Sequence, residues 1–474
     1  MNRDLLRDLC AAAAAALLVV TAAVLGTAIE NSDGTLHVNW PPLYARWGPH
    51  VGPGTPAALI VAVAVVAYGP RLAARLRWGA LLGAAWVTAA GWTWSLALVD
   101  GWQRGVAGRL TTKYEYLQVI DRFEDIHGTL RDFTRHILID SPGHWPAHVA
   151  GHPPASTLSF VLLDRMGLGG GAWAGAWCIT VGATTCVAVL VTVRALAGEE
   201  LARRAAPFLV VSPAAVWMGT SADGYFAAVA AWAVALLARA VTGSRPRLTA
   251  LGSGLLFGLT CYLSYGLTLF ALIAVAVLVL GRTRPSGGDP RDRRRPLTLS
   301  LPVSLSLPLS FLTGLAVVPL LFTLAGFNWW EAYRLLVERY YQGAGGIRPY
   351  GYWVWANLAC TVLIVGVATV AGLRRAVRML VRGRADVLPR RGPSGDAAYA
   401  SAAGPRLALL VLAALAALLV ADLSGMSKAE TERIWLPFAL WLLPAGAFLT
   451  RPRAWLAAQA GLALLINHAL FTGW

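Results

Sequence analysis

The sequence predicts an all-α, polytopic membrane protein, a transmembrane helical bundle of about 13 spans. Three observations lead to this fold class. Hydrophobic residues make up 57% of the 474 residues and charged residues only 14%, a balance unlike that of soluble globular domains. Apolar runs of about 20 residues, long enough to cross a hydrocarbon core of about 30 Å as helices, recur along the chain. Lys and Arg gather in alternate loops between these runs.

The predicted spans follow one another along the whole chain. They cover residues 9–29, 57–76, 79–98, 171–194, 205–220, 222–241, 249–264, 265–281, 300–325, 352–373, 406–422, 434–450 and 454–472. The first run follows two arginines and ends in small residues, as a secretory signal does, but we interpret it as an uncleaved span. In both cases residue 30 lies outside, so the remaining topology is the same.

Charge supports this topology with the amino terminus inside. The predicted cytoplasmic segments then hold 27 of the 40 Lys and Arg residues and 8 of the 24 acidic residues. The net charge of +16, which in a soluble chain would suggest nucleic acid, is therefore explained by the membrane, and nucleic acid is excluded as a partner. The five cysteines lie in or beside apolar runs without a CxxC pair, which indicates neither a metal site nor a disulfide.

The two sides of the membrane differ in the kind of loop they carry. The inner connections "RTRPSGGDPRDRRRP" and "RADVLPRRGPSGDAAYASAAGPR" have the composition of flexible linkers. The outer connections, residues 99–155, 327–353 and 422–435, are rich in aromatic and acidic residues. Any chemistry is therefore expected on the extracytoplasmic face.

The longest outer loop shows an amphipathic pattern. Within residues 114–140, apolar residues recur at spacings of three and four: Tyr116, Ile120, Phe123, Ile126 and Leu130. This predicts amphipathic interfacial helices with their apolar face in the headgroup region, where a lipid-borne substrate would be met. The stretch "HWPAHVAGHPPASTL" follows and leads into an apolar helix of about three turns, too short to span.

This order of parts resembles the GT-C superfamily of membrane glycosyltransferases. The matching parts are a span ending in Asp100, residues 111–140, "GHPPASTLSFVLLDRMGLG" and a span closing at "VRALAGEELARR". The segment "SKAETERIWLPF" is similar to the "ERxxLP" signature near the end of many such enzymes. More narrowly, "LSYG", "GGIRPYGYWVWANL" and "DLSGMSKAETERIWLPF" resemble an actinobacterial family for which the mycobacterial methylthioxylose transferase is a candidate member.

The resemblance covers residues 79 to about 450 and implies three parts. Residues 1–78 would be two extra spans with an outer loop, 79–281 a GT-C-like core with its catalytic outer loop at 99–170, and 282–474 a carboxy-terminal module with outer loops 326–352 and 422–434. The implied reaction transfers a sugar from a polyprenyl-phosphate donor to a cell-envelope glycan or glycolipid, with inversion. A transporter or flippase of envelope lipid intermediates is the alternative, as is another lipid-phosphate-dependent transferase.

Asp100 is the candidate general base. An acceptor hydroxyl needs a carboxylate within hydrogen-bond reach, and Asp100 stands where a span leaves the membrane, as the base does in GT-C enzymes. The family's second acid is absent here, because the motif reads "DG". Asp100 as a plain boundary residue is the competing interpretation. Further acids of the amphipathic stretch are alternatives: Glu115, Asp121, Glu124 and Asp125.

The leaving phosphate requires positive charge or hydrogen-bond donors. Arg433, Lys428 and Arg348 are the candidates, since an Arg fork fits phosphate oxygens. An arginine that reaches the interface and pairs with Glu430 or Glu432 is the alternative. His152 is expected to contact the donor phosphate or the acceptor, and further candidates for the same site are His148, Asp223, Tyr265, Tyr350 and Glu432.

Three histidines, His144, His148 and His152, are four residues apart and would align on a helix as metal ligands. Pro146 and Gly151 argue against a helix there, so no metal ligand is assigned and no cofactor is certain, although a divalent cation stays open. We expect the outer loops to form one cavity that joins Asp100, His152 and Arg433.

Overall fold

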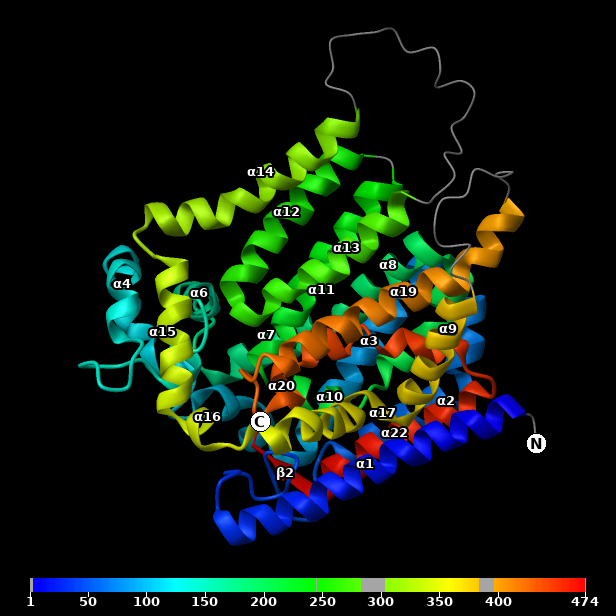
Figure 1. The fold of residues 1–474 in the computed structure, drawn as a ribbon, viewed down its shortest axis with the longest axis horizontal. Helices are drawn as coiled ribbons and strands as arrows, with labels where there is room; N and C mark the ends of the chain where they lie inside the picture. Colours follow the sequence, from blue (N-terminus) through cyan, green and yellow to red (C-terminus); the bar gives the residue numbers. More distant parts are fainter. Residues whose placement is uncertain (1–2, 244, 283–302, 383–395, 474) are drawn as a thin grey trace, which may run out of the picture.

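The computed structural model describes residues 3–243, 245–282, 303–382 and 396–473. Nearly all of its elements are helices, which confirms the all-α class, and one sheet of two strands joins segments from both ends of the chain (Figure 1). The first third of the chain holds α1 (Arg3–Asp33), β1 (Ala45–Trp47), α2 (Thr55–Arg75), α3 (Trp78–Ala97), η1 (Leu98–Asp100), η2 (Gln103–Ala107), η3 (Arg109–Thr111), η4 (Tyr116–Phe123), α4 (Ile126–Asp132), η5 (Phe133–His136), α5 (Ala147–Ala150) and α6 (Ala155–Arg165).

The remaining elements are mostly long helices with short helical turns between them. The middle of the chain holds α7 (Gly171–Gly182), α8 (Thr185–Ala197), α9 (Glu199–Val210), α10 (Ala215–Met218), α11 (Ala222–Thr242), α12 (Pro246–Leu263), η6 (Tyr265–Leu269), α13 (Phe270–Arg282) and α14 (Val303–Leu324). The last part holds α15 (Trp329–Gln342), α16 (Ala344–Ile347), α17 (Tyr350–Arg382), α19 (Asp396–Leu423), α20 (Thr431–Ile434), α21 (Leu436–Ala439), η8 (Leu443–Phe448), α22 (Pro452–Ala469) and β2 (Leu470–Thr472).

Eight helices in the described part of the chain are long and apolar enough to cross a membrane, so the protein is a multi-pass membrane protein. They are Arg3–Asp33, Thr55–Arg75, Trp78–Asp100, Gly171–Ala197, Ala222–Thr242, Leu305–Leu324, Tyr350–Arg382 and Ala402–Leu423. Two predicted spans do not form as single helices. In 205–220, α9 ends at Val210, and 434–450 consists of the short helices α21 and η8. The total of thirteen stays a prediction.

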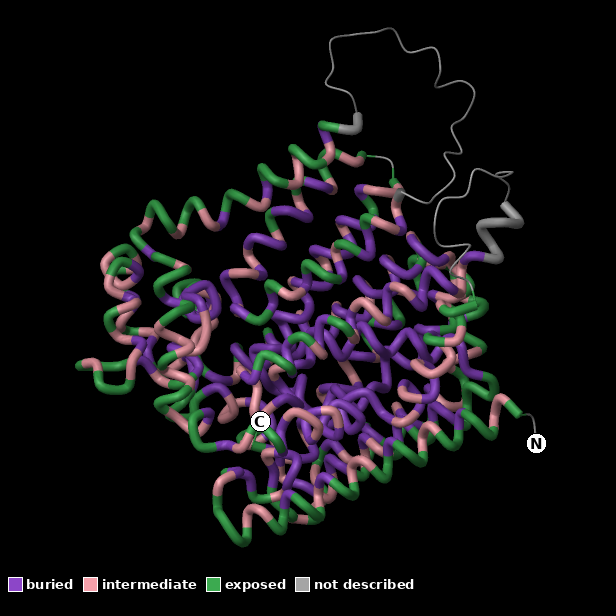
Figure 2. The backbone as a smooth tube through the Cα atoms, viewed as in Figure 1, coloured by how far each residue is buried: buried purple, intermediate pink, exposed green. Residues whose placement is uncertain are grey.

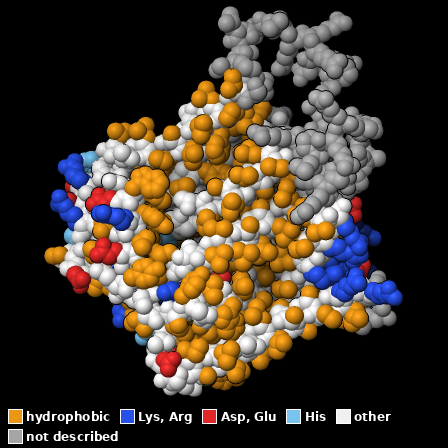
Figure 3. Space-filling view, in the orientation of Figure 1, with side chains coloured by type: hydrophobic (Ala, Val, Ile, Leu, Met, Phe, Trp, Pro, Cys, Tyr) orange, Lys and Arg blue, Asp and Glu red, His pale blue; other side chains and the backbone are white. Residues whose placement is uncertain are grey.

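The segments predicted to lie on one side of the membrane meet at one end of the bundle. At the predicted inner end, Arg375 of α17 donates to Asp8 of α1 at 2.5 Å, and Arg203 of α9 donates to the carbonyl of Leu76 at 2.8 Å. At the other end, the Tyr44 amide donates to Glu432 at 2.9 Å. Figure 3 shows hydrophobic side chains across the middle of this face and charged ones toward its two edges, as a membrane-spanning bundle requires.

The core lies around α11 and α17, while α1 and α14 lie at the periphery (Figure 2). Buried residues make up 72% of the apolar window of α11 and 78% of that of α17, but only 17% for α1 and 11% for α14. Nine of the 21 residues of α11 are alanines, and these small side chains allow neighbouring helices to approach closely. α11 packs against α7, α8, α12 and α13, and its first turn carries Asp223 into the outer end of the bundle.

The predicted amphipathic helices of residues 114–140 form as three short pieces, η4, α4 and η5. The helix breaks at Val119, whose φ of −131° is not helical, and again before Asp125, which caps α4. Tyr116, Phe123 and Leu130 are buried against the rest of the protein. The apolar face that the sequence indicates therefore packs on protein, and the short helix expected after the prolines forms as α6.

Residues 3–78 pack closely against the rest of the described chain. α1 lies along α17, and β1 pairs antiparallel with β2 so that Arg46 faces Phe471. Phe471 of β2 stacks on His50, which lies 2.7 Å from Asp100, so the first outer loop and the carboxy-terminal segment together cover the region next to Asp100.

Candidate functional site

Four segments bring four polar side chains together at the predicted outer end of the bundle. We name Glu115, His148, Asp223 and Arg433 the Arg433 cluster. Arg433 Nη1 donates to Asp223 Oδ2 at 2.6 Å, and its Nη2 lies 3.3 Å from His148 Nε2. His148 Nδ1 lies 3.0 Å from Glu115 Oε1. All four are buried, with exposed fractions of 8% or less, so they interact in a medium that strengthens electrostatic effects.

These contacts determine the tautomer of His148. A guanidinium has only donors, so His148 Nε2 must accept from Arg433. The ring proton is therefore on Nδ1 and is donated to Glu115, which leaves His148 neutral. The second oxygen of Glu115, Oε2, is buried without a hydrogen-bond partner among the described residues. It is thus the one oxygen of this cluster's carboxylates that is both buried and unsatisfied in the described chain.

The charges around Arg433 stabilise its protonated form. Burial alone would lower the pKa of Arg433, but Asp223, Glu430 and Glu115 outweigh this effect and raise it. Tyr116 packs against His148, and burial followed by the charges of Asp223 and Glu115 raises the pKa of its hydroxyl well above the ordinary value. Both groups therefore stay protonated at neutral pH, Arg433 as a cation and Tyr116 as a neutral hydroxyl.

His152 lies beside the Arg433 cluster. Its Nδ1 lies 2.7 Å from the carbonyl of His148, to which it donates, and its ring packs against Tyr116 and Phe226. Burial lowers the pKa of His152 to about 4, so the ring is neutral at physiological pH. His152 therefore lies beside His148 and close to Arg433, while its expected contact with the donor phosphate or the acceptor stays a prediction.

Arg348 and Lys428 lie on the far side of Glu430. Arg348 Nη1 donates to the carbonyl of Lys428 at 2.8 Å and to Glu430 Oε1 at 3.3 Å, and Glu430 Oε2 lies 3.7 Å from Arg433. Lys428 Nζ donates to the carbonyl of Gly345 at 2.8 Å. Glu430 therefore connects the two arginines that the sequence indicates as phosphate ligands.

Glu432 points away from its neighbour Arg433 toward the first outer loop. Its Oε1 accepts the Tyr44 amide hydrogen, and the side chain is fully buried. Burial raises the pKa of Glu432 to about 7, so about half of the molecules carry a neutral acid there at neutral pH.

Asp100 lies in a second group, which we name the Asp100 cluster: His50, Asp100, Arg104 and Arg109. Asp100 Oδ1 lies 2.7 Å from His50 Nε2, and its Oδ2 accepts from Arg109 Nη2 at 2.7 Å and lies 3.8 Å from Arg104 Nε. His50 Nδ1 faces the carbonyl of Gly48 at 2.8 Å, so both ring nitrogens face acceptors, an arrangement that an imidazolium satisfies.

Positive charge predominates in the Asp100 cluster. Burial lowers the pKa of Arg109 to about 10 although Asp100 acts in the opposite direction, so Arg109 remains a cation. Within the described chain, neither Arg104 Nε nor Arg109 Nε has a hydrogen-bond acceptor. Phe471 of β2 covers the group, stacked on His50 with ring centroids 4.1 Å apart and 3.8 Å from the Arg104 guanidinium carbon.

The two clusters are neighbours, but Asp100 does not belong to the Arg433 cluster. Among the described residues no hydrogen bond or ion pair joins Asp100 to His152 or Arg433. The link is indirect: Thr220 Oγ1, three residues before Asp223, donates to the carbonyl of Gly105, next to Arg104, at 3.0 Å.

The remaining candidates lie outside both clusters. Asp121, Glu124 and Asp125 are exposed, as a solvated helix face predicts. Tyr265 is buried against Trp329 and Tyr333, and Tyr350 donates to the carbonyl of Leu423. His144 is exposed, and the part of the chain that the structure describes contains no group of three or more His, Cys, Asp or Glu side chains arranged to hold a metal ion.

His50, Arg104 and Arg109 did not stand out in the sequence. His50 belongs to the first outer loop, outside the part that resembles glycosyltransferases, and the two arginines follow Asp100 in a segment without regular periodicity. The one available signal is the excess of Arg directly after a span on a face where basic residues are otherwise few.

Comparisons with known proteins add little to this geometry. No protein-family model matches the chain, and no curated protein matches it. Among solved structures, the Archaeoglobus fulgidus oligosaccharyltransferase in complex with zinc and sulfate aligns with 76% of this chain, at 13% identity and a TM-score of 0.34. The alignment covers 53% of that protein, so this chain spans about half of its length. A similarity this low carries no weight for the function of this chain.

Proposed function

We propose that this protein is a membrane glycosyltransferase that transfers a sugar from a polyprenyl-phosphate donor to a cell-envelope acceptor on the extracytoplasmic side. The observation that carries the proposal is the Arg433 cluster, in which four separate segments hold two carboxylates, a neutral imidazole and a guanidinium together. A buried carboxylate whose orientation is set by a neighbouring imidazole is suited to removing a proton from a hydroxyl.

The proposed reaction is a single displacement. The acceptor hydroxyl loses its proton to a carboxylate as its oxygen bonds to the anomeric carbon of the donor sugar. The bond from that carbon to the phosphate oxygen breaks, and polyprenyl phosphate leaves with the electron pair. The site must therefore provide one base and a set of cationic donors for the phosphate, and inversion follows from the single displacement.

The charge balance of the two clusters supports a division of these roles. Three described carboxylates, Glu115, Asp223 and Glu430, surround two arginines, Arg433 and Arg348, with Glu115 bound through His148, and this excess of negative charge favours a base there. In the Asp100 cluster two arginines and His50 surround one carboxylate, and two guanidinium N–H groups lack an acceptor, which favours a phosphate.

We therefore propose Glu115 as the base, because its Oε2 has no hydrogen-bond partner in the described chain and His148 orients its other oxygen. Arg104 and Arg109 would bind the donor phosphate, with Asp100 holding them in place. Arg433, His152, Arg348 and Lys428 would position the acceptor and Glu115. This assignment differs from the roles expected from the sequence, in which Asp100 is the base and Arg433 binds the phosphate.

The test measures sugar transfer from short-chain polyprenyl-phosphate pentoses and hexoses to envelope glycans by the full chain in liposomes. Glu115→Gln should lower kcat by about 100-fold or more, and Arg104→Gln should mainly raise KM for the donor. Glu124→Gln, an exposed acid of the same loop, serves as the matched control and should keep wild-type rates.

Each other outcome is informative. If Asp100→Asn abolishes kcat while Glu115→Gln does not, Asp100 is the base, as the sequence indicates. If intact protein transfers no sugar from any lipid-linked donor, the glycosyltransferase proposal fails, and a transporter or another lipid-phosphate-dependent transferase takes its place.

A further inference from the structure

A groove rich in arginine lies at the opposite end of the bundle from both clusters. It has a volume of about 610 Å³ and lies between the end of α2 and the start of α22. Its lining residues are Pro70, Arg71, Ala74, Arg75, Arg451, Pro452, Arg453 and Ala454. Arg203 bonds the carbonyls of Ala73 and Leu76 beside it, which places the groove at the predicted cytoplasmic end.

Among the residues that the structure describes, the four arginines of the groove have no carboxylate partner. All are exposed, and no acidic side chain of the described residues lies within 4.0 Å of any of them. The described acids at this end pair with other arginines: Asp8 with Arg374 and Arg375, and Glu199 with Arg194 and Arg203. Positive charge in the groove is therefore not neutralised by the described protein.

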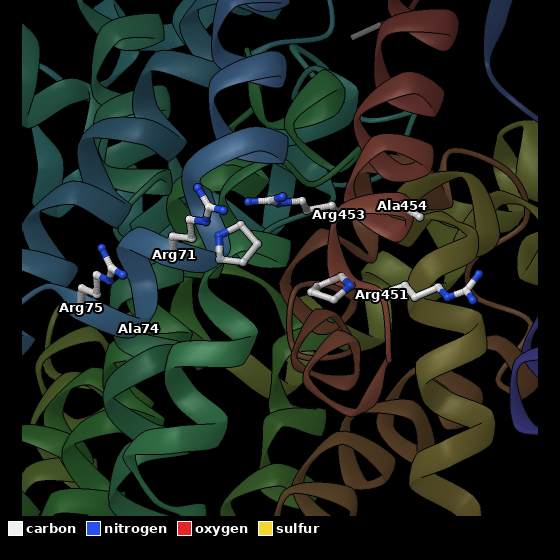
Figure 4. Close-up of a pocket in the computed structure, with 8 residues that line it drawn as sticks. Arg71, Ala74, Arg75, Arg451, Arg453 and Ala454 are labelled. Carbon is white, nitrogen blue, oxygen red and sulfur yellow. The ribbon is translucent and has the colours of Figure 1, made fainter. Parts of the chain in front are cut away.

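The arginines are also oriented for a shared ligand. Figure 4 shows Arg71 and Arg453 pointing toward one another across the groove, while Arg75 and Arg451 extend to its sides. Two guanidinium groups that face each other repel unless an anion lies between them. The start of α22 adds the partial positive charge of a helix N-terminus, and Pro70, Ala74 and Ala454 add apolar wall.

We propose that this groove binds a phosphate group, that of an anionic membrane lipid, with Arg71 and Arg453 as its principal ligands. Guanidinium forks match phosphate oxygens, and basic pockets between spans on the cytoplasmic side suit anionic headgroups. The apolar walls beside the arginines suit the acyl-chain end of a lipid, which free phosphate lacks. This inference is independent of the proposed transferase activity.

A bound lipid would join two helices that also meet at the other end of the molecule. α2 packs along α22, and near their outer ends Thr55 Oγ1 lies 3.0 Å from His468 Nε2. A ligand that bridges their inner ends should therefore raise the thermal stability of the whole pair, because it binds only the folded arrangement.

The experiment uses the full chain, purified and delipidated in neutral detergent. Its thermal midpoint is measured with added phosphatidylglycerol, phosphatidylcholine or inorganic phosphate, and lipid retention is measured by native mass spectrometry. Phosphatidylglycerol should raise the midpoint by several degrees and stay bound, whereas phosphatidylcholine should not. Arg71→Gln with Arg453→Gln should weaken phosphatidylglycerol binding by about fivefold for each arginine removed.

A matched control separates the site from general surface charge. Arg239→Gln with Arg247→Gln removes the same charge from exposed positions at the predicted inner ends of α11 and α12 and should leave binding unchanged. Arg71→Lys with Arg453→Lys keeps both positive charges and tests whether the forked guanidinium geometry is needed. If the double Gln variant does not fold, Arg453→Gln alone replaces it.

Three results would overturn the proposal: equal losses in the groove and control variants, equal stabilisation by phosphatidylcholine, or no binding of phosphatidylglycerol to the wild type. If inorganic phosphate stabilises the protein through Arg71 and Arg453 and the lipid adds nothing, the phosphate site stands and its lipid source is rejected.

Discussion

At the scale of single residues, burial determines how the ionisable groups behave. Arg433 and Asp223 are both buried and form a short ion pair, so each charge depends on the other for its solvation. Exposed acids such as Asp121 carry no such dependence. Removing the charge of an aspartate therefore affects stability differently at a buried position and at an exposed one.

Asp223→Asn should destabilise the protein because it leaves the Arg433 cation buried without its nearest carboxylate. Breaking a buried pair from one side costs about 3 kcal/mol or more of the free energy of unfolding. The thermal midpoint in detergent, compared with that of Asp121→Asn, measures the effect. Equal midpoints for the two variants would contradict the pair's structural role.

The raised pKa of Glu432 predicts how the stability of the protein changes with pH. Its pKa is about 7 in the folded protein and near 4.5 when unfolded, so its contribution to stability is fully present below pH 4.5 and is lost as pH rises through 7. The side chain in Glu432→Gln cannot ionise, so the thermal midpoint of this variant should rise relative to that of the wild type between pH 5 and 8. A constant difference between the two proteins over this range would show that Glu432 does not titrate there.

At the scale of elements, interruptions in helices position the site. α17 contains Gly366, whose φ of 79° and ψ of 156° break the helix in its middle. A Cβ at this position would lie 3.3 Å from Gln459 and 3.4 Å from Pro213. The break lets the first half of α17 face the outer loops while the second half reaches Asp8 of α1.

Gly366→Ala should therefore lower stability, since only glycine adopts this backbone conformation at little cost; the expected loss is about 1–3 kcal/mol. Gly351→Ala, in the first turn of the same helix, meets no atom within 4 Å and should be neutral. Chemical unfolding in detergent measures both. A neutral Gly366→Ala would mean that the helix straightens without loss.

The β1–β2 pair is the second element with a specific consequence. Phe471 packs on His50 and on the Arg104 guanidinium, whereas Trp47 of the same sheet is 63% exposed. Phe471→Ala should raise KM for the lipid-phosphate donor about fivefold, because Arg104 loses its aromatic support, and Trp47→Ala should not. An unchanged KM in Phe471→Ala would show that Phe471 of β2 does not contribute to donor binding.

At the scale of the whole molecule, charge and hydrophobicity together orient the chain. Segments with excess Arg meet at one end of the bundle, and the two polar clusters lie at the other. Reporters fused after Arg282 and after Gln342 test this orientation. A fluorescent protein should be active at the first position and an alkaline phosphatase at the second, because Lys and Arg are retained in the cytoplasm. The reverse pattern would place both clusters inside.

The fold class and most residues of the Arg433 cluster can be predicted from sequence patterns alone. Hydropathy and charge are local properties of any stretch of about 20 residues, so a membrane bundle can be predicted from the sequence. His148, His152, Asp223 and Arg433 are candidates from the sequence because each lies in an outer connection or where such a connection meets a predicted span.

Which of these residues contact one another depends on the packing of the whole chain. Asp223 and Arg433 are 210 positions apart and form one ion pair, and Asp100 joins His50 and Arg109 instead of Arg433. The first turn of α11 places Asp223 next to Arg433 of α20, and the pairing of β1 with β2 places Phe471 on His50 beside Asp100. Such contacts depend on distances through space, and a local pattern along the chain does not predict them.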